Sequence, residues 1–231
     1  MKKVLATILA LMMLFSATSV FAGDFDELSA DVTAKAVADL NALGVMVGDT
    51  NGDFRGEATI TRAEFAVILC RIKNFEGLAK SYQGYSSFID MEEHWAKGYV
   101  EAARMNEFIN GYPDGTFRPQ EIVTVGQAAK MLVCALGYED EYVKNIGFPL
   151  GYTFKGADIG LSAGVDDDRG FLSSLANTPA TRNFVAFIVS NALDIPIRDF
   201  VGYVYGVKEY DILDGTNGKK FETFRTRYFG K

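Results

Sequence analysis

The sequence predicts a mainly α-helical protein built from copies of one helix–loop–helix unit. Residues 25–72 recur without a gap at residues 88–135, and the identical positions gather at turn glycines and at a Phe-Arg pair. Apolar residues in both segments follow the spacing of amphipathic helices, and dense turn signals separate the helical stretches. Units of this kind bury their apolar faces against one another, so the copies are expected to share one core.

Residues 1–22 have the layout of a secretory signal peptide. Two lysines precede an apolar run over residues 4–15, and Val20-Phe21-Ala22 presents small residues at the two positions that a signal peptidase reads. The run is shorter than the roughly 20 residues of a membrane span. We therefore expect cleavage after Ala22, export, and no membrane span in the mature chain.

Charge and cysteine content narrow the function classes. Cleavage would change the formal net charge from −7 to −9, because it removes two lysines and no acids. Such an acidic chain lacks the clustered Lys and Arg that phosphate contacts require, which excludes nucleic acid as a partner. Two cysteines, Cys70 and Cys134, do not make a disulfide framework. We expect buried free thiols, with a bridge between them as the alternative in an exported protein.

The first copy contains two predicted helices. Apolar residues over 32–43 keep helical spacing, and Gly44 follows as a C-terminal stop. A turn over 49–53 leads to the second helix. There Thr61 is the expected N-cap and Glu64 stands three residues later, as a capping box requires.

The second copy repeats this pattern. Its helices are predicted over about 94–106 and 125–136, and Pro113-Asp114-Gly115 forms the turn between them, because proline fixes φ and glycine accepts positive φ. Residues 74–87 and 138–155 are polar and are interpreted as linkers after the first and second copies.

A fainter third copy appears at an offset of 120. This offset lays Thr181-Arg182 over Thr61-Arg62, and Gly164 over Gly44. An acidic segment over 166–170 replaces the glycine turn, so the third copy has lost part of the pattern.

The tail after the third copy differs from the repeats in amino-acid composition. Residues 201–205 and 221–229 are aromatic and β-prone, with a turn over 214–218 between them. A tail this short cannot bury its own core, so it either packs on the repeats or begins a truncated region. We divide the chain into a signal peptide (1–22), three repeats (24–80, 85–138 and 139–195) and the tail (196–231).

Two groups of residues resemble the hallmarks of the S-layer homology (SLH) repeat. Phe88-Ile89-Asp90, His94-Trp95-Ala96 and the run over 109–119 match the first hallmark, and Ile60-Thr61-Arg62-Ala63-Glu64-Phe65 is similar to the second. The resemblance covers roughly residues 24–193. It implies three SLH repeats, the third degenerate, in one pseudo-threefold helical bundle with a short β-prone C-terminal tail.

The resemblance also implies a cell-wall function. SLH repeats hold exported bacterial proteins non-covalently on a secondary cell-wall polysaccharide, often pyruvylated, which binds in grooves between neighbouring repeats. We therefore expect a secreted protein at the cell wall or S-layer surface of a bacterium, with this polysaccharide as its partner. Peptidoglycan and other surface-layer proteins are the alternative partners.

Individual residues can be assigned to that role. A pyruvyl ketal carries a carboxylate, and Arg62 could donate two hydrogen bonds to it. An arginine in the first turn of a helix also opposes the macrodipole, which hints at a use beyond packing. Trp95 offers a face to a sugar, Glu64 and Asp90 offer acceptors, and turn glycines permit close approach. The candidate ligand-binding residues are Arg62, Glu64, Thr61, Asp90, Trp95, Gly48, Gly111 and Arg182.

Departures from the family pattern weaken some of the sites. The second copy has Thr124-Val125-Gly126-Gln127, so it lacks both the arginine and the carboxylate, and the third copy keeps Arg182 without the acid. Val32 stands in the first copy where the second has Trp95. We expect the groove built on Arg62 to be the strongest.

Structural roles compete with binding roles at several positions. Glu64 completes a capping box whether or not it binds ligand, and Trp95 at a helix start would serve equally as a core residue. The turn over 49–53 resembles a calcium loop, but Phe54 and Ile60 stand where a glycine and a bidentate Glu belong. We therefore expect no metal.

Other function classes have weaker support. The sequence contains one histidine and no nucleophile motif or phosphate-binding motif. It therefore gives no basis for predicting an enzyme or a cofactor. If the chain hydrolysed cell-wall glycan, the acids Asp166, Asp167 and Asp168 would be the first candidates. A self-assembling surface-layer or protein-interaction module is the main alternative to anchoring, and the chain is either a fragment without its cargo domain or an anchor in itself.

Overall fold

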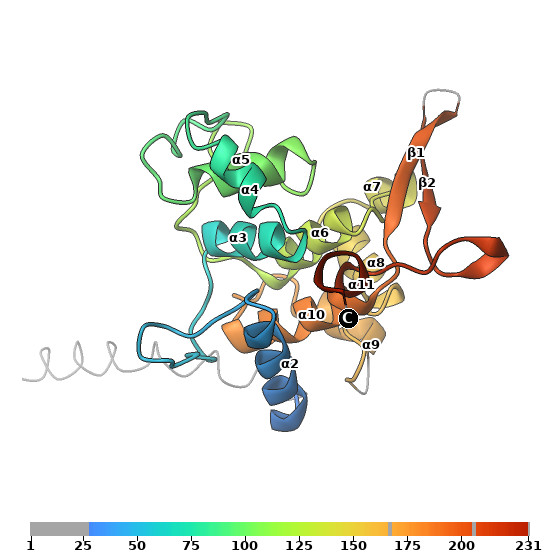
Figure 1. The fold of residues 1–231 in the computed structure, drawn as a ribbon, viewed down its shortest axis with the longest axis horizontal. Coiled ribbons are helices and arrows are strands. Elements are labelled where there is room, and N and C mark those ends of the chain that lie inside the picture. The colour runs from blue at the N-terminus through green and yellow to red at the C-terminus, as the bar shows by residue number, and fades with distance from the viewer. Residues whose placement is uncertain (1–27, 166–167, 205–206, 231) are drawn as a thin grey trace, which may run out of the picture.

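The computed structural model describes residues 28–165, 168–204 and 207–230, and over these residues the fold is mainly helical, as the sequence predicts (Figure 1). The expected signal peptide, residues 1–22, lies outside the described residues. Within the described ranges, no helix has both the length and the apolar character needed to cross a membrane.

Each copy contributes a pair of longer helices. The second helix of every pair begins after a threonine with extended backbone, whose hydroxyl accepts a hydrogen bond from the amide three residues later. This N-cap fixes where the helix starts. The pairs are α2 (Ala30–Ala42) with α3 (Arg62–Ile72), α5 (Lys97–Met105) with α6 (Val125–Ala135), and α8 (Leu150–Asp158) with α10 (Arg182–Asp194).

Shorter helices occupy the segments interpreted as linkers, so that interpretation is wrong. Helix α4 (Glu76–Ser81) lies within 74–87, and α7 (Glu141–Ile146) lies within 138–155, together with the first part of α8. A helix of six residues shows less than two turns of apolar periodicity, which is too little to distinguish it from a polar connection.

The three copies meet at a ring of backbone hydrogen bonds. The amide of Ile60 donates to the carbonyl of Ala180 (3.2 Å), that of Ala180 to Val123 (2.9 Å), and that of Val123 to Ile60 (3.0 Å). The first amide of each second helix then donates to the loop of the next copy, which satisfies a group that has no partner within its own helix. This cyclic order is the pseudo-threefold arrangement that the resemblance implies. The donor and acceptor pairs are Arg62 to Glu121, Val125 to Thr178 and Arg182 to Ala58.

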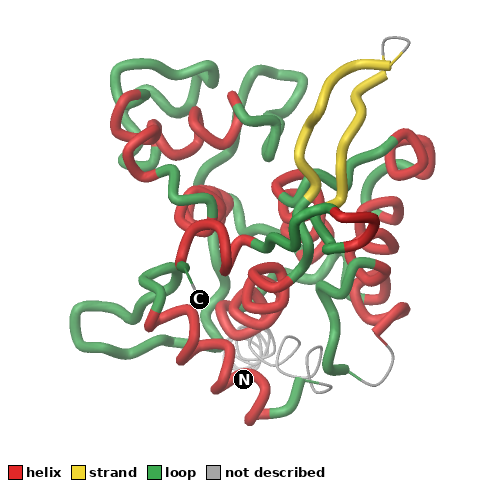
Figure 2. The backbone as a smooth tube through the Cα atoms, turned by 45° about the vertical axis from the view of Figure 1, so that its right-hand side comes forward, coloured by secondary structure: helices red, strands yellow, loops and turns green. Residues whose placement is uncertain are grey.

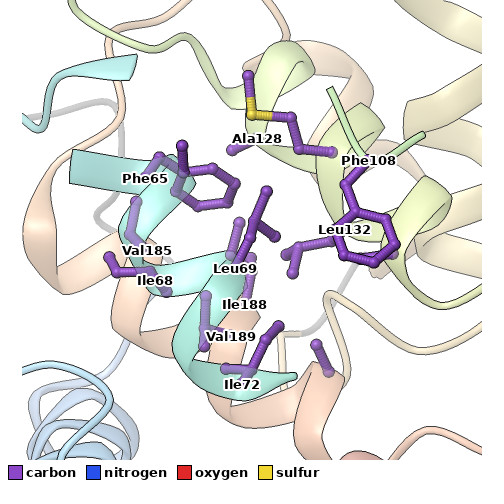
Figure 3. Packing of buried hydrophobic residues seen from close by; sticks show 14 of the residues in the cluster. Phe65, Ile68, Leu69, Ile72, Phe108, Ala128, Leu132, Val185, Ile188 and Val189 are labelled. Carbon is purple, nitrogen blue, oxygen red and sulfur yellow. The ribbon is translucent and has the colours of Figure 1, made fainter. Parts of the chain in front are cut away.

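Helices α3, α6 and α10 surround the centre of the core (Figure 3). Phe65 and Leu69 of α3 lie beside Leu132 of α6 and Ile188 of α10, and all four side chains are fully buried. Burial of one such side chain stabilises the fold by about 1.5–3 kcal/mol, so this shared core couples the three copies.

The third copy departs from the expected register after its first helix. In every copy a residue with positive φ follows the C-cap: Gly44 (φ 70°), Glu107 (φ 64°) and Gly160 (φ 97°). The amide after it donates back into the helix. The alignment of Gly164 with Gly44 is therefore wrong, because Gly160 occupies that place. The loop that follows is longer than in the other copies and contains α9 (Asp168–Ser174), so a single offset cannot align both of its ends.

The tail begins with a hairpin that stands away from the helices (Figures 1 and 2). Strand β1 (Arg198–Val204) pairs antiparallel with β2 (Val207–Ile212), with a register shift between Phe200 and Gly202. The prediction of a strand over 221–229 is wrong, because residues Phe224–Phe229 form helix α11. Thr223 caps this helix through its side chain, and that cap overrides the β preference of the aromatic residues.

Helix α11 of the tail packs on the repeats. Phe224 is fully buried, and Arg225 forms ion pairs with Asp39 of α2 (2.7 Å) and Asp194 of α10 (2.6 Å). Helix α11 thus links the first copy to the third.

Both cysteines are free thiols, so the alternative of a disulfide bridge is wrong. Burial raises the pKa of Cys70 to about 12. Burial also raises the pKa of Cys134, which lies close to Glu139.

Candidate functional site

Arg62 is held tightly at the start of α3, with 4% of its surface exposed. Its Nε donates to the carbonyl of Phe117 (2.9 Å), and its Cζ lies 4.7 Å from the centre of the Phe117 ring and 5.0 Å from that of Tyr112. Burial is the main cause that lowers the pKa of Arg62, although a guanidinium remains charged in proteins. Among the described residues no carboxylate pairs with it, because Asp114 and Glu121 of the same loop pair with Arg118.

A surface cavity of about 140 Å³ lies beside this guanidinium. We call it the Arg62 groove. Its walls come from all three copies: the arginine from α3, a loop and helix α6 from the second copy, and an aromatic ring that precedes α8 of the third. The lining residues are Arg62, Phe108, Ile109, Asn110, Gly111, Tyr112, Gln127, Lys130, Met131 and Phe148.

A second cavity, of about 150 Å³, has an arginine from the third copy, and we call it the Arg182 groove. Its arginine starts α10, the loop and helix α3 come from the first copy, and the aromatic ring precedes α5 of the second. The lining residues are Val45, Met46, Val47, Ile60, Glu64, Val67, Ile68, Arg71, Trp95 and Arg182.

Arg182 shares two contacts with Arg62, to the carbonyl and to the ring of a phenylalanine, and adds a third. Its Nε donates to the carbonyl of Phe54 (2.7 Å), its Nη2 to that of Val47 (2.9 Å), and its Cζ lies 4.6 Å from the centre of the Phe54 ring. Phe54 corresponds to Phe117 at the repeat offset. Burial is the main cause that lowers the pKa of Arg182, and the charge of Glu64 opposes this shift.

The two grooves are therefore equivalent by the pseudo-threefold arrangement. Positions 45–47, 64, 67 and 68 of the Arg182 groove recur 63 residues later as 108–110, 127, 130 and 131 of the Arg62 groove. Trp95 and Phe148 also correspond, since each stands two residues before the first helix of its copy. Each groove thus combines an arginine from one copy, a loop and helix from the next, and an aromatic ring from the third.

The position that would complete the ring lacks the arginine and the polar residue of the helix. Val125 starts α6 where Arg62 and Arg182 start their helices, and Phe184 of α10 stands where Glu64 and Gln127 stand in theirs. Val125 and Phe184 are both fully buried in the core. The chain thus presents two grooves with an arginine in the part that the structure describes.

Arg62 and Glu64 do not share a groove, although the sequence analysis assigned both to one site. Residues i and i+2 of a helix point in different directions, so Arg62 faces the second copy while Glu64 faces Arg182 and Trp95. The local motif therefore supplies one residue to each of two neighbouring sites.

Thr61 and Glu64 form the predicted capping box. Thr61 Oγ1 accepts from the Glu64 amide (3.2 Å), and Glu64 Oε2 accepts from the Thr61 amide (2.8 Å). Thr61 lines neither groove, so the structure gives it a role in the start of α3. Glu64 has a second oxygen and also lines the Arg182 groove, so its two predicted roles are compatible.

Three further candidates have structural explanations. Asp90 accepts hydrogen bonds from the amides of Phe117 (2.8 Å) and Arg118 (2.7 Å), which ties the start of the second copy to its loop. A Cβ on Gly48 would lie 2.8 Å from the carbonyl of Gly52. A Cβ on Gly111 would lie 2.1 Å from the ring of Phe88, so both turns require glycine; Gly111 in addition lines the Arg62 groove.

Trp95 is 59% exposed, so the alternative of a core role for it is wrong. It precedes α5 rather than lying within the predicted helix over 94–106, and its ring lies 5.5 Å from that of His94. Of the acids considered for glycan hydrolysis, Asp166 and Asp167 lie outside the described residues and Asp168 begins α9.

Sequence reasoning missed Phe148, Lys130 and Gln127 in the Arg62 groove. Phe148 fell in a segment interpreted as a linker, although it precedes α8 as Trp95 precedes α5. Lys130 and Gln127 could have been found by extending the repeat offset to positions 67 and 64. Neither residue belongs to the family hallmark, in which a glutamate is expected at position 127.

Comparisons with known proteins identify the family to which the first and second copies belong. The family model of the S-layer homology domain matches residues 28–66 and 87–129. A surface layer protein of Brevibacillus choshinensis is 33% identical over 211 residues, which cover 88% of this chain and 18% of that protein. A middle cell wall protein of Brevibacillus brevis is 33% identical over 204 residues, covering 87% of this chain and 18% of that protein.

A cellulosome-anchoring protein of Acetivibrio thermocellus is 37% identical over 101 residues, which cover 42% of this chain and 22% of that protein. The chain thus spans about a fifth of the length of these curated relatives.

Proposed function

Since this chain is an S-layer homology domain protein of the bacterial cell surface, we propose that it anchors to the wall by binding secondary cell-wall polysaccharide in the Arg62 and Arg182 grooves. The observation that carries the proposal is the repetition of one constellation. An oriented arginine, a helix face and an exposed aromatic ring recur together at the two equivalent positions. The proposed activity is binding, without catalysis.

Arg62 suits an anionic sugar such as a pyruvyl ketal. Arg62 uses its Nε on the Phe117 carbonyl, and no described residue bonds to its Nη atoms. Those two nitrogens can bind one carboxylate in the parallel geometry that favours guanidinium over ammonium. Because the Phe117 carbonyl and the flanking rings already fix the side chain, little conformational entropy is lost when the ligand binds.

The aromatic rings suit a neutral sugar face. Trp95 is 59% exposed and Phe148 is 52% exposed, although large aromatic side chains are usually buried. Each ring stands at the rim of a groove that also contains an arginine, so one saccharide unit could contact both groups. Two such grooves on one chain would bind a repeating polymer with a higher avidity than either groove alone.

Sedimentation with purified cell-wall sacculi tests the proposal. The chain should co-sediment with intact sacculi and remain in solution when the wall polymer has been extracted with acid. The double variant Arg62→Ala, Arg182→Ala should lose most of the binding, whereas Arg198→Ala should retain it, because Arg198 lies over Tyr138 and Tyr210 outside both grooves.

Each alternative partner has its own outcome in this assay. Binding that survives acid extraction would refute polysaccharide anchoring and favour peptidoglycan. Loss of sedimentation together with self-association of the soluble protein would favour a self-assembling surface-layer module. Thermal melting of both variants controls for folding.

A further inference from the structure

The Arg62 and Arg182 grooves have the same plan but different charges. Gln127 of the Arg62 groove replaces Glu64 of the Arg182 groove, and Lys130 replaces Val67. The Arg62 groove is therefore lined by two cations and no acid. The charged residues that line the Arg182 groove are two cations, Arg182 and Arg71, and one acid, Glu64. Arg71 also forms an ion pair with Glu76 (3.5 Å).

The second cation of the Arg62 groove, Lys130, lies against an aromatic ring rather than a carboxylate. Among the ion pairs of the described residues, none involves Lys130, and its Nζ lies 4.9 Å from the centre of the Tyr152 ring. The aromatic face orients the ammonium group and leaves its donors available.

Gln127 is oriented toward the same cavity. It completes the capping box of α6 with its Oε1, and its Nε2 donates to the Tyr112 hydroxyl (3.3 Å), whose ring lies under Arg62. An amide in this position adds no negative charge, whereas a glutamate would attract both cations and compete with an anion. The local field thus favours negative charge, although the whole chain has a net charge of −7.

On the basis of the proposed polysaccharide function, we propose that the Arg62 groove selects a saccharide unit that carries two negative charges, and that Lys130 is the residue that sets this preference. Arg62 binds the first charge through its guanidinium, and Lys130 binds the second as a point charge. The Arg182 groove, with a valine in place of the lysine, takes a unit with one negative charge. The two charges of the preferred unit are one phosphate or two carboxylates.

Titration calorimetry with three defined probes tests this selectivity. The probes are a pyruvylated methyl hexosaminide with one carboxylate, a disaccharide with one pyruvyl ketal and one uronate, and a hexose 6-phosphate. In the Arg182→Ala background, which leaves only the Arg62 groove, a two-charge probe should bind about tenfold more tightly than the one-charge probe. Which of the two-charge probes shows this preference distinguishes phosphate from paired carboxylates.

Matched variants assign the preference to the lysine. Lys130→Val should reduce the ratio of the two affinities to about one, and Lys130→Arg should keep it, because only the charge is required. The reverse change, Val67→Lys in the Arg62→Ala background, should raise the ratio in the Arg182 groove toward tenfold. Thermal melting of each variant controls for folding.

Three results would overturn the inference: equal affinities for one-charge and two-charge probes, no measurable binding of either two-charge probe, or a ratio unchanged by Lys130→Val. These results are distinct from failure of the proposed function. If sacculi still bind wild-type protein through the two arginines, only the charge selectivity is wrong. If the arginine double variant binds sacculi normally, the proposed function itself is wrong.

Discussion

Lys73 provides a quantitative test of how the tail joins the repeats. It follows α3, its Nζ donates to the carbonyl of Ala135 at the end of α6 (3.1 Å), and it lies 5.0 Å from the Phe108 ring and 4.8 Å from the Phe224 ring. One ammonium group of the first copy therefore contacts both the second copy and the tail. Burial, and secondarily the charge of Arg227, lower the pKa of Lys73 from 10.5 to about 8.

The lowered pKa has a definite consequence for stability. Between pH 8 and 10.5 the unfolded chain binds more protons at Lys73 than the folded chain does, so stability rises with pH across this window. Below pH 8 Lys73 is charged in both the folded and the unfolded chain, so the folded state bears the full free-energy cost of burying this charge. From about pH 7 to about pH 9.5, the free energy of unfolding should gain about 2 kcal/mol from this group, at 1.36 kcal/mol per pKa unit.

Urea denaturation of the wild type and of Lys73→Met at these two pH values measures the gain. Methionine has a similar shape and does not titrate, so the variant should lack the pH-dependent increment while other titrating groups cancel in the comparison. Asp199, whose charge opposes the shift, remains in both proteins. An equal change in stability with pH in the wild type and the variant would refute the assignment of a buried, partly desolvated Lys73.

Three further predictions concern the cap, the tail and the thiols. Thr61→Ala should lower the free energy of unfolding by about 1 kcal/mol and the melting temperature by about 2–4 °C, because it removes the cap of α3; no change would show that the capping box contributes nothing. Phe224→Ala should cost about 3–5 kcal/mol in chemical denaturation, against less than about 0.5 kcal/mol for the exposed Tyr203→Ala, and equal costs would mean that α11 is not docked. Cys70 and Cys134 should react with a thiol reagent only slowly at neutral pH until urea is added, because their pKa values are raised, and rapid labelling of the native protein would contradict the raised pKa values.

Local signals in the sequence predicted the parts of the fold that depend on neighbouring residues. The capping box of Thr61 and Glu64 involves residues three apart, and the glycine turns depend on backbone freedom at single positions, so both were visible in the repeat. The tail shows the limit of such signals. Its aromatic residues predicted a strand, but the Thr223 cap and the burial of Phe224 against the repeats gave a helix.

The grooves could not be predicted from one copy, because each is assembled from three. Arg62 of the first copy contacts the loop of the second copy, and Phe148 of the third copy lines the same groove. These residues are farther apart in the sequence than the length of any motif. The ring of bonds among Ile60, Val123 and Ala180, together with the bonds from the first amide of each second helix, fixes which loop meets which helix. The offset of 120 places Ala180 over Ile60, but no local signal in the sequence indicates that these two residues are bonded.

The stoichiometry of saccharide binding tests the central claim most directly. Titration calorimetry with a pyruvylated methyl hexosaminide should give two sites in the wild type, one in Arg62→Ala, one in Arg182→Ala and none in the double variant. Because the grooves share their plan but no lining residue, the site that remains in each single variant should keep its own affinity. A single site in the wild type, or loss of both sites when one arginine is removed, would contradict two equivalent grooves formed by the three copies.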